Sequence, residues 1–226
     1  MIISLLCQDL TFAEKLLIFL AILIAIIVAL CVHEFSHAYA AYKCGDNTAK
    51  ERGRLTINPI KHLDVYGFLC MMLFGFGWAK LVPINPMNFK NFKRDTFWVS
   101  VAGVISNIIL VFVSIPFFLL VANFGDLSNL GFMFLYNLFL YSAFINAIFA
   151  VFNLLPIYPL DGFNAIAAYL RYENKFVLFM RKYGPMILIA FLILTEIIRS
   201  VTGVSVILWL ANQIIWPFQQ FWLLFF

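Results

Sequence analysis

The chain has 226 residues and a net charge of +4; 64% of its residues are hydrophobic and only 12% are charged. Soluble domains contain about a quarter charged residues, so this composition excludes a water-soluble globular domain and predicts an all-α polytopic membrane protein. The apolar composition implies a lipid bilayer around the chain. The small positive net charge is more informative about topology than about an anionic partner, so we expect no nucleic-acid partner.

Predominantly apolar stretches mark the candidate membrane segments. In chain order they cover residues 16–42, 65–79, 97–122, 127–160, 185–195 and 200–226. A helix needs about 20 residues to cross a bilayer, so the second stretch is too short for a straight span. Gly67, Gly75 and Gly77 lie within that stretch and Pro83 follows it, which further disfavours a continuous helix. We therefore expect about five to six transmembrane segments with a re-entrant loop or hairpin.

Basic residues predict the orientation of these segments. Lys and Arg gather in residues 43–62, 80–94 and 171–182, whereas the loop around Asp126 has none. Cytoplasmic loops carry the excess of basic residues, so the three basic segments are predicted to face the cytoplasm and Asp126 the opposite side. Residues 65–79 then enter and leave on one side. Such irregular backbone is tolerated at membrane depth only against protein or a water-filled cavity, which predicts a polar cavity open to the cytoplasm.

Three ionisable side chains interrupt the first apolar stretch. His33 and His37 are four residues apart and share one face of a helix, and Glu34 lies beside them. This H-E-x-x-H arrangement can bind one zinc ion through both imidazoles and supply a glutamate as general base. Ionisable residues inside a membrane are costly and usually functional. The alternative is a buried polar network that only bridges helices.

A catalytic zinc needs a third protein ligand and one open position. Asp161 follows a long uncharged stretch that runs inward from the loop at Asp126. It therefore reaches a depth similar to that of the histidines, which lie roughly 10 Å from the cytoplasmic end of their helix. Pro156 and Pro159 interrupt the helix just before it. Asp161 is the predicted third ligand of one Zn²⁺ per chain; the alternative is the N-cap of an interfacial helix.

At these motifs the chain resembles the site-2 proteases, a family of intramembrane zinc metalloproteases. The likeness covers roughly residues 20–170 and includes five segments: "HEFSH" at 33–37, "NLLPIYPLDG" at 153–162, "AGVISN" at 102–107, "GRLTINPIKHLD" at 53–64 and "GWAKLVPINPMNF" at 77–89. The resemblance implies that His33, His37 and Asp161 bind zinc and that Glu34 is the catalytic base. The last two segments are typical of small prokaryotic members of the family.

Peptide hydrolysis also requires hydrogen-bond donors for the substrate and the developing oxyanion. Asn107 and Asn153 lie in apolar segments and in family-like motifs, so both are predicted to bind the substrate or the transition state. The alternative is hydrogen bonding between helices, which we also expect for Asn146. Gly75 and Gly77 are predicted to allow close approach of a substrate strand, because residues 75–83 are expected to present an extended edge.

The sequence therefore predicts an intramembrane zinc endopeptidase that cleaves transmembrane protein or peptide substrates. We expect a single integral-membrane domain over residues 1–226, with a catalytic core at about 12–170 and C-terminal membrane segments at about 185–226. The predicted location is the inner (cytoplasmic) membrane, with the active site opening toward the cytoplasm. The alternatives are a non-catalytic protein that binds or escorts membrane clients, and a metal transporter. The sequence indicates no oligomeric state.

Overall fold

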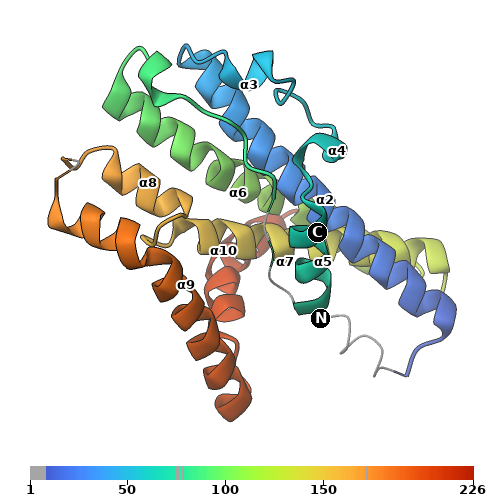
Figure 1. Cartoon of the computed structure of the whole chain (residues 1–226). Helices are drawn as coiled ribbons and strands as arrows, with labels where there is room; N and C mark the ends of the chain where they lie inside the picture. The colour runs from blue at the N-terminus through green and yellow to red at the C-terminus, as the bar shows by residue number, and fades with distance from the viewer. Residues whose placement is uncertain (1–8, 75–76, 78, 172) are drawn as a thin grey trace.

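The computed structural model describes residues 9–74, 77, 79–171 and 173–226, and all regular structure among them is helical. The elements are α2 (Phe12–Lys43), α3 (Thr48–Glu51), α4 (Pro59–His62), α5 (Val65–Phe74), the 3₁₀-helix η1 (Pro86–Asn88), α6 (Phe92–Phe124), α7 (Leu130–Leu154), α8 (Asp161–Ala167), α9 (Lys175–Thr202) and α10 (Val206–Trp222). Figure 1 shows their arrangement.

Four of the described helices, α2, α6, α7 and α9, are long and apolar enough to cross a membrane. The prediction of an all-α polytopic membrane protein is confirmed. Five to six membrane segments were expected. The difference lies in the two shorter helices: α5 has ten residues, too few for a span, and α10 has 17, at the lower limit for one.

The centre of the molecule is a bundle of α2, α6 and α7, which pack against one another along much of their length (Figure 1). Alanines on the inner face of α2, including Ala21, Ala25 and Ala29, are almost fully buried and let the neighbouring backbones approach closely. A second apolar cluster joins α6 and α7 to α10. The bundle therefore holds the three helices that carry most of the sequence motifs.

Helix α2 is one continuous helix of 32 residues, about 48 Å long at 1.5 Å per residue. Its start is fixed by a capping box, in which Thr11 accepts from the backbone of Glu14 and the Glu14 carboxylate accepts from the backbone of Thr11. Because the helix continues unbroken through the H-E-x-x-H segment, His33 and His37 remain one helical turn apart and on the same face.

The two ends of the 65–79 stretch lie close together in the structure. The backbone N–H of Lys80 donates to the carbonyl of His62 at 2.8 Å, so the two ends of the stretch lie side by side. Helix α5 occupies its first part and is about 15 Å long, half of a membrane crossing. This proximity is what a re-entrant segment requires, and its return to one face of the membrane stays a prediction.

The loop after α2 is tied to the segment that precedes α6. The Asp46 carboxylate accepts from the backbone of Thr48 at 3.1 Å, from the backbone of Asn85 at 2.7 Å and from the side chain of Asn88 at 2.7 Å. Burial alone would raise the pKa of the Asp46 carboxyl, but these hydrogen bonds hold that pKa below its ordinary value. Asp46 thus ties residues 85–88 to the loop that follows α2.

Helix α9 diverges from the bundle, as Figure 1 shows, and most of its surface is exposed. It packs tightly against the core at Gly184, where an added Cβ would lie 2.6 Å from the carbonyl oxygen of Tyr158. Most of its exposed side chains are apolar, including Met186, Ile189 and Ile193. A surface of this kind is suited to contact with lipid.

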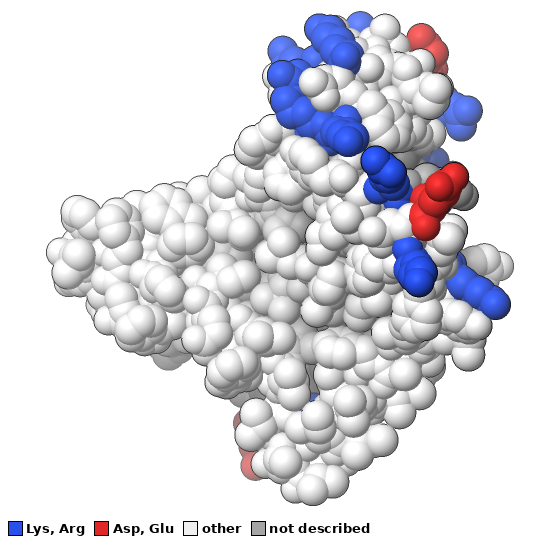
Figure 2. Space-filling model, turned by 90° about the vertical axis from the view of Figure 1, so that its left-hand side faces the viewer, with Lys and Arg blue, Asp and Glu red and all other residues white. Residues whose placement is uncertain are grey.

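Most of the charged side chains on the surface shown in Figure 2 lie in one part of it. Lys and Arg gather at its upper end and along its right-hand side, whereas the remainder of that face is almost entirely uncharged. This separation matches a protein that crosses the bilayer with its basic loops on one side.

We predict that single cysteines placed at Lys50 and Lys90 will react with a membrane-impermeant maleimide from the same face of the membrane, and that Asp126→Cys will react only from the other. The reason is the hydrogen bond between Lys80 and His62, which places the two ends of the 65–79 stretch side by side. The four native cysteines are first replaced, and the replaced chain without a new cysteine is the control. Labelling of positions 50 and 90 from opposite faces would contradict the hairpin.

Candidate functional site

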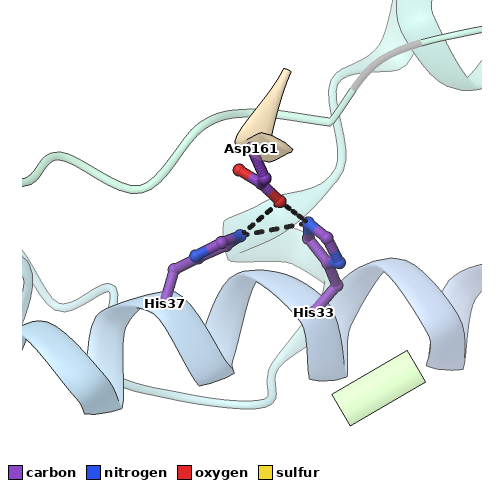
Figure 3. Close-up of side chains that lie close together, drawn as sticks. All are labelled: His33, His37 and Asp161. Atoms are coloured by element: carbon purple, nitrogen blue, oxygen red, sulfur yellow. Dashed lines mark hydrogen bonds and ion pairs between the residues drawn. The ribbon is translucent and has the colours of Figure 1, made fainter. Parts of the chain in front are cut away.

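Three side chains from two elements converge in the interior of the bundle. His33 and His37 project from α2, and Asp161 projects toward them from the first turn of α8 (Figure 3). The two imidazole Nε2 atoms are 3.1 Å apart, and each lies 3.2 Å from Oδ2 of Asp161. The structure thus brings together the three predicted metal ligands.

Asp161 reaches this position because α7 ends at Leu154 and a proline-containing turn leads into α8. The first turn of α8 packs directly on the end of α7: a Cβ at Gly162 would lie 2.3 Å from the carbonyl oxygen of Leu154. Only a glycine permits that approach without displacing backbone. The predicted break before Asp161 is therefore present, and the N-cap of α8 is Leu160, so Asp161 does not itself cap the helix.

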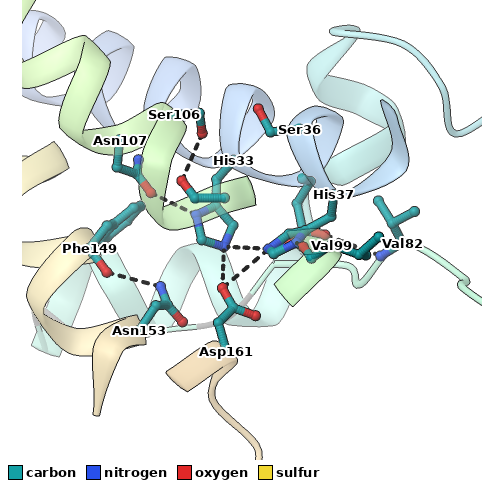
Figure 4. A network of polar contacts seen from close by, with 12 residues as sticks. His33, Ser36, His37, Val82, Val99, Ser106, Asn107, Phe149, Asn153 and Asp161 are labelled. Atoms are coloured by element: carbon teal, nitrogen blue, oxygen red, sulfur yellow. Dashed lines mark hydrogen bonds and ion pairs between the residues drawn. The ribbon is translucent and has the colours of Figure 1, made fainter. Parts of the chain in front are cut away.

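The partners of the imidazoles direct both Nε2 lone pairs to the centre of the site. Nδ1 of His37 lies 2.7 Å from the carbonyl oxygen of Val99, which can only accept a hydrogen bond, so Nδ1 carries the proton. Nδ1 of His33 lies 2.6 Å from Oδ1 of Asn107 and donates in the same way (Figure 4). In neutral rings each Nε2 is then an acceptor, and such outer contacts are characteristic of metal-binding histidines.

The convergent atoms fit a small tetrahedral cation. Oδ2 of Asp161 is buried and has no hydrogen-bond partner, although it is 3.2 Å from both nitrogens. Three acceptors this close repel one another unless a cation lies between them. Zinc ligands at about 2.0–2.1 Å in a tetrahedron are about 3.3 Å apart, which is close to the 3.1–3.2 Å separations observed here. Among the described residues, this group can hold a metal ion.

Gly103 of α6 lies against both imidazoles. A Cβ at this position would lie 2.5 Å from Cε1 of His33 and 2.5 Å from Nε2 of His37. Val99, Gly103 and Asn107 follow one another at intervals of four residues, so they share one face of α6. The antiparallel partner α2 meets that face with its two histidines. The sequence motif at 102–107 therefore includes a backbone surface on which the rings rest.

Glu34 is also buried, and its Oε2 accepts a hydrogen bond from the backbone N–H of Val82 at 3.1 Å. Val82 lies in the irregular stretch that leads to Asn85, a hydrogen-bond partner of Asp46. Glu34, both histidines and Asp161 line one cavity of about 800 Å³, together with Gly77 and Asn153. The predicted base therefore has access to the same space as the three convergent atoms.

The predicted substrate-binding residues occupy different surroundings. Asn153 lines the cavity, and its side-chain NH₂ donates to the carbonyl of Phe149 at 3.1 Å. Gly77 also lines the cavity, whereas Gly75 lies outside the described residues. Asn107 is fully buried, with its oxygen at His33 and its NH₂ at Asn146. Its substrate contact stays a prediction; hydrogen bonding between helices, the stated alternative, describes its contacts here.

Several contributors to the site were not assigned from sequence: Gly103, the carbonyl of Val99, the N–H of Val82 and Asn146. The spacing of Val99, Gly103 and Asn107 was a usable signal, since a glycine one turn from an apolar-segment asparagine marks a close helix approach. The Val99 carbonyl and the Val82 N–H could not be identified from the sequence, because nearly every residue type carries the same backbone groups.

Comparison with known proteins supports this assignment. The chain is 42% identical to "Putative zinc metalloprotease YwhC" of Bacillus subtilis over 158 residues, which cover 64% of this chain and 67% of that protein. It is 25% and 28% identical, over 207 residues, to proteins named "Putative zinc metalloprotease Rip2" of Mycolicibacterium smegmatis and Mycobacterium tuberculosis; the matches cover 89% of this chain and 74% of each relative.

The chain belongs to the site-2 protease family. The predicted resemblance is therefore confirmed, and with it the predicted cofactor, Zn²⁺, which suits the donor set of two imidazoles and a carboxylate. The names of the relatives support a proteolytic function in general. No family model matches the chain, and no solved structure matches it significantly.

We predict that Gly103→Ala will lower metal retention by at least about 10-fold, because the new methyl group displaces the imidazoles from their outer partners. Ile105→Ala, on the exposed face of the same helix, is the control and should retain the metal. The measurement is metal content per chain after gel filtration, with helicity followed by circular dichroism. Full metal content in Gly103→Ala would show that the rings do not depend on this contact.

Proposed function

We propose that this protein is an intramembrane zinc endopeptidase that hydrolyses peptide bonds in transmembrane segments of other proteins. The observation that carries the proposal is the triangle of His33, His37 and Asp161 donor atoms at the wall of a cavity inside a membrane helix bundle. A glutamate on the same wall supplies the second requirement of the reaction. Membership of a metalloprotease family supports the same conclusion.

In this proposal His33, His37 and Asp161 hold the zinc and leave one position open to the cavity. When bound, zinc supplies Lewis acidity that brings the pKa of a water molecule to about 7. Glu34 accepts the proton of the attacking water and later delivers it to the leaving amine. The Val82 N–H fixes one carboxylate oxygen of Glu34 and leaves the other available to the water.

Asn153 is the proposed donor to the developing oxyanion. Its NH₂ group has two hydrogens, one of which is directed to the carbonyl of Phe149, and the side chain lines the cavity beside Asp161. A donor held by its own helix needs little reorganisation when charge develops on the substrate oxygen. We retain Asn107 only as a predicted substrate contact, because both ends of its amide are engaged.

Residues 79–82 are the proposed docking edge for an unwound substrate strand. Lys80 and Val82 both direct their N–H groups into the protein, toward His62 and Glu34. In an extended chain alternate N–H groups point to opposite edges, so that of Leu81 would face outward. Pairing there would replace hydrogen bonds that the substrate loses on unwinding. Gly77 lines the cavity. Gly75 lies outside the described residues, and its contact with the substrate strand stays a prediction.

The proposed location is the inner (cytoplasmic) membrane, with the cavity opening toward the cytoplasm. The end of α2 nearest the site leads into the basic residues of the 43–62 segment, and basic loops are retained on the cytoplasmic side. We also propose one membrane domain over residues 1–226, with a catalytic core at about 12–170 and C-terminal membrane segments at about 185–226.

We predict that Glu34→Gln will retain zinc but lower cleavage by about 10²–10⁴-fold, because an amide cannot accept the proton of the water. Asp161→Ala should lose both zinc and cleavage, because it removes one ligand. The measurement uses purified full-length protein in proteoliposomes with a transmembrane peptide substrate, with product masses and zinc content determined in parallel. Glu51→Gln, an exposed carboxylate outside the site, is the matched control and should behave as wild type.

Other outcomes of this experiment favour the alternative functions. Zinc-dependent binding of the peptide without products, in wild type and Glu34→Gln alike, would indicate an escort protein. Zinc passage across the proteoliposome membrane would indicate a transporter. Full zinc content in Asp161→Ala would remove Asp161 from the ligand set, and near-normal cleavage by Glu34→Gln would remove Glu34 from the mechanism.

We predict that Leu81→Pro will lower cleavage of a substrate with a stable helix by about 2–10-fold, the equivalent of one hydrogen bond of about 0.5–1.5 kcal/mol. Proline removes the outward N–H, whereas Leu81→Ala keeps it and is the matched control. A substrate weakened by glycine near the cut should be less affected, since it needs less compensation on unwinding. Equal rates for proline and alanine variants on both substrates would exclude this edge.

A further inference from the structure

A continuous chain of buried side-chain amides joins α7 to the histidines of α2. Asn146 of α7 donates its NH₂ to the carbonyl oxygen of Ser142 at 2.8 Å. Its Oδ1 accepts from Nδ2 of Asn107 of α6 at 2.7 Å, and Oδ1 of Asn107 lies 2.6 Å from Nδ1 of His33. Both asparagines are fully buried, and Figure 4 shows the last contact of the chain.

The direction of every hydrogen bond in this chain is fixed at its α7 end. The backbone carbonyl of Ser142 can only accept, so the NH₂ of Asn146 faces it and the Oδ1 of Asn146 faces Asn107. That oxygen in turn requires the NH₂ of Asn107 to face α7. The oxygen of Asn107 is thereby left for His33, whose Nδ1 must carry the proton.

We propose that Asn146 is a positioning residue of the zinc site: it orients the Asn107 amide and thereby holds His33 in the tautomer whose Nε2 lone pair faces the metal. The inference rests on the proposed function in one respect, that His33 is a zinc ligand. Asn146 itself touches neither the proposed ligands nor the cavity wall, and it acts only through Asn107.

Removal of the Asn146 oxygen would free the orientation of Asn107. With no acceptor on α7, rotation of the amide by half a turn would place its NH₂ against Nδ1 of His33. Nδ1 would then have to accept, and the proton would move to Nε2, toward the zinc position. A protonated Nε2 cannot bind a metal. His37 lacks this vulnerability, because its partner is the carbonyl of Val99, which cannot reverse.

Asn137 provides a matched control on the same helix. Its NH₂ also donates to a carbonyl four residues earlier, that of Met133, at 2.8 Å. It is partly buried and takes no part in the chain to His33. A loss of helix packing alone would affect both asparagines in a similar way, whereas loss of the tautomer control affects Asn146 only.

The test measures zinc affinity of purified full-length protein by competition with a chromophoric chelator. We expect Asn146→Leu to weaken zinc binding by about 10–100-fold, the usual effect of losing an outer partner of a metal-binding histidine. Asn137→Leu should leave the affinity unchanged. Circular dichroism and gel filtration verify that each variant is folded.

The decisive arm uses Asn107→Asp, which presents an oxygen to His33 whichever way it is turned. In that background the orientation no longer matters, so adding Asn146→Leu should cause no further loss of zinc affinity. If Asn146 were only a packing residue, the added substitution would weaken zinc binding in both backgrounds by the same factor. This variant also keeps the test decisive if Asn146→Leu alone folds poorly, since the Asn107→Asp chain can be compared with and without it.

Nitrogen NMR of the zinc-depleted full chain gives a second readout, because the sequence has only three histidines. We expect the His33 proton on Nδ1 in the wild type and on Nε2 in Asn146→Leu. Wild-type affinity and an unchanged tautomer in Asn146→Leu would overturn the inference. His33→Ala separates the two proposals: if this variant binds zinc normally, the ligand assignment itself fails, whereas loss of zinc there with no effect of Asn146→Leu refutes only the positioning role.

Discussion

The main constraint on the structure is that it holds three acceptor atoms within 3.2 Å of one another at the site, although these atoms repel one another. In water such atoms would separate and each bind its own hydrogen-bond donors. Here the surrounding helices prevent that separation: Val99 and Asn107 fix the outer nitrogens, Gly103 supports the rings from α6, and the turn before α8 delivers the carboxylate. A divalent cation between the three atoms removes the repulsion, so this geometry favours metal binding.

Much of the site could be predicted from the sequence, because its key side chains are rare in their surroundings. Two histidines four residues apart in a helix share one of its faces. A single carboxylate at the end of a long apolar stretch is costly to bury, which indicates a functional role such as metal binding. The return of the 65–79 stretch was likewise implied by basic residues on both of its flanks. Lys80 and His62 lie side by side, as that prediction requires.

The remaining features depend on how the helices meet, which no local pattern encodes. The antiparallel pairing of α2 with α6 sets His37 opposite Val99 and His33 opposite Asn107. A shift of one turn would have left Asn107 free to face the cavity, as the substrate-binding prediction required. The apolar stretch at 185–195 is also shorter than the helix that contains it: Lys175, Arg181 and Lys182 lie in the N-terminal part of the 28-residue helix α9, and Pro185 lies inside it.

The separation of the ligands along the chain has a consequence for biosynthesis. His33 precedes Asp161 by 128 residues, so at about 5–20 residues per second the ribosome completes the site roughly 6–26 s after the histidines are made. Val82, Val99 and Asn107, the partners of Glu34, His37 and His33, are made during that interval, and only the Asp161 carboxylate is missing until its end. A site with all three ligands therefore cannot form until the three long bundle helices have already been made.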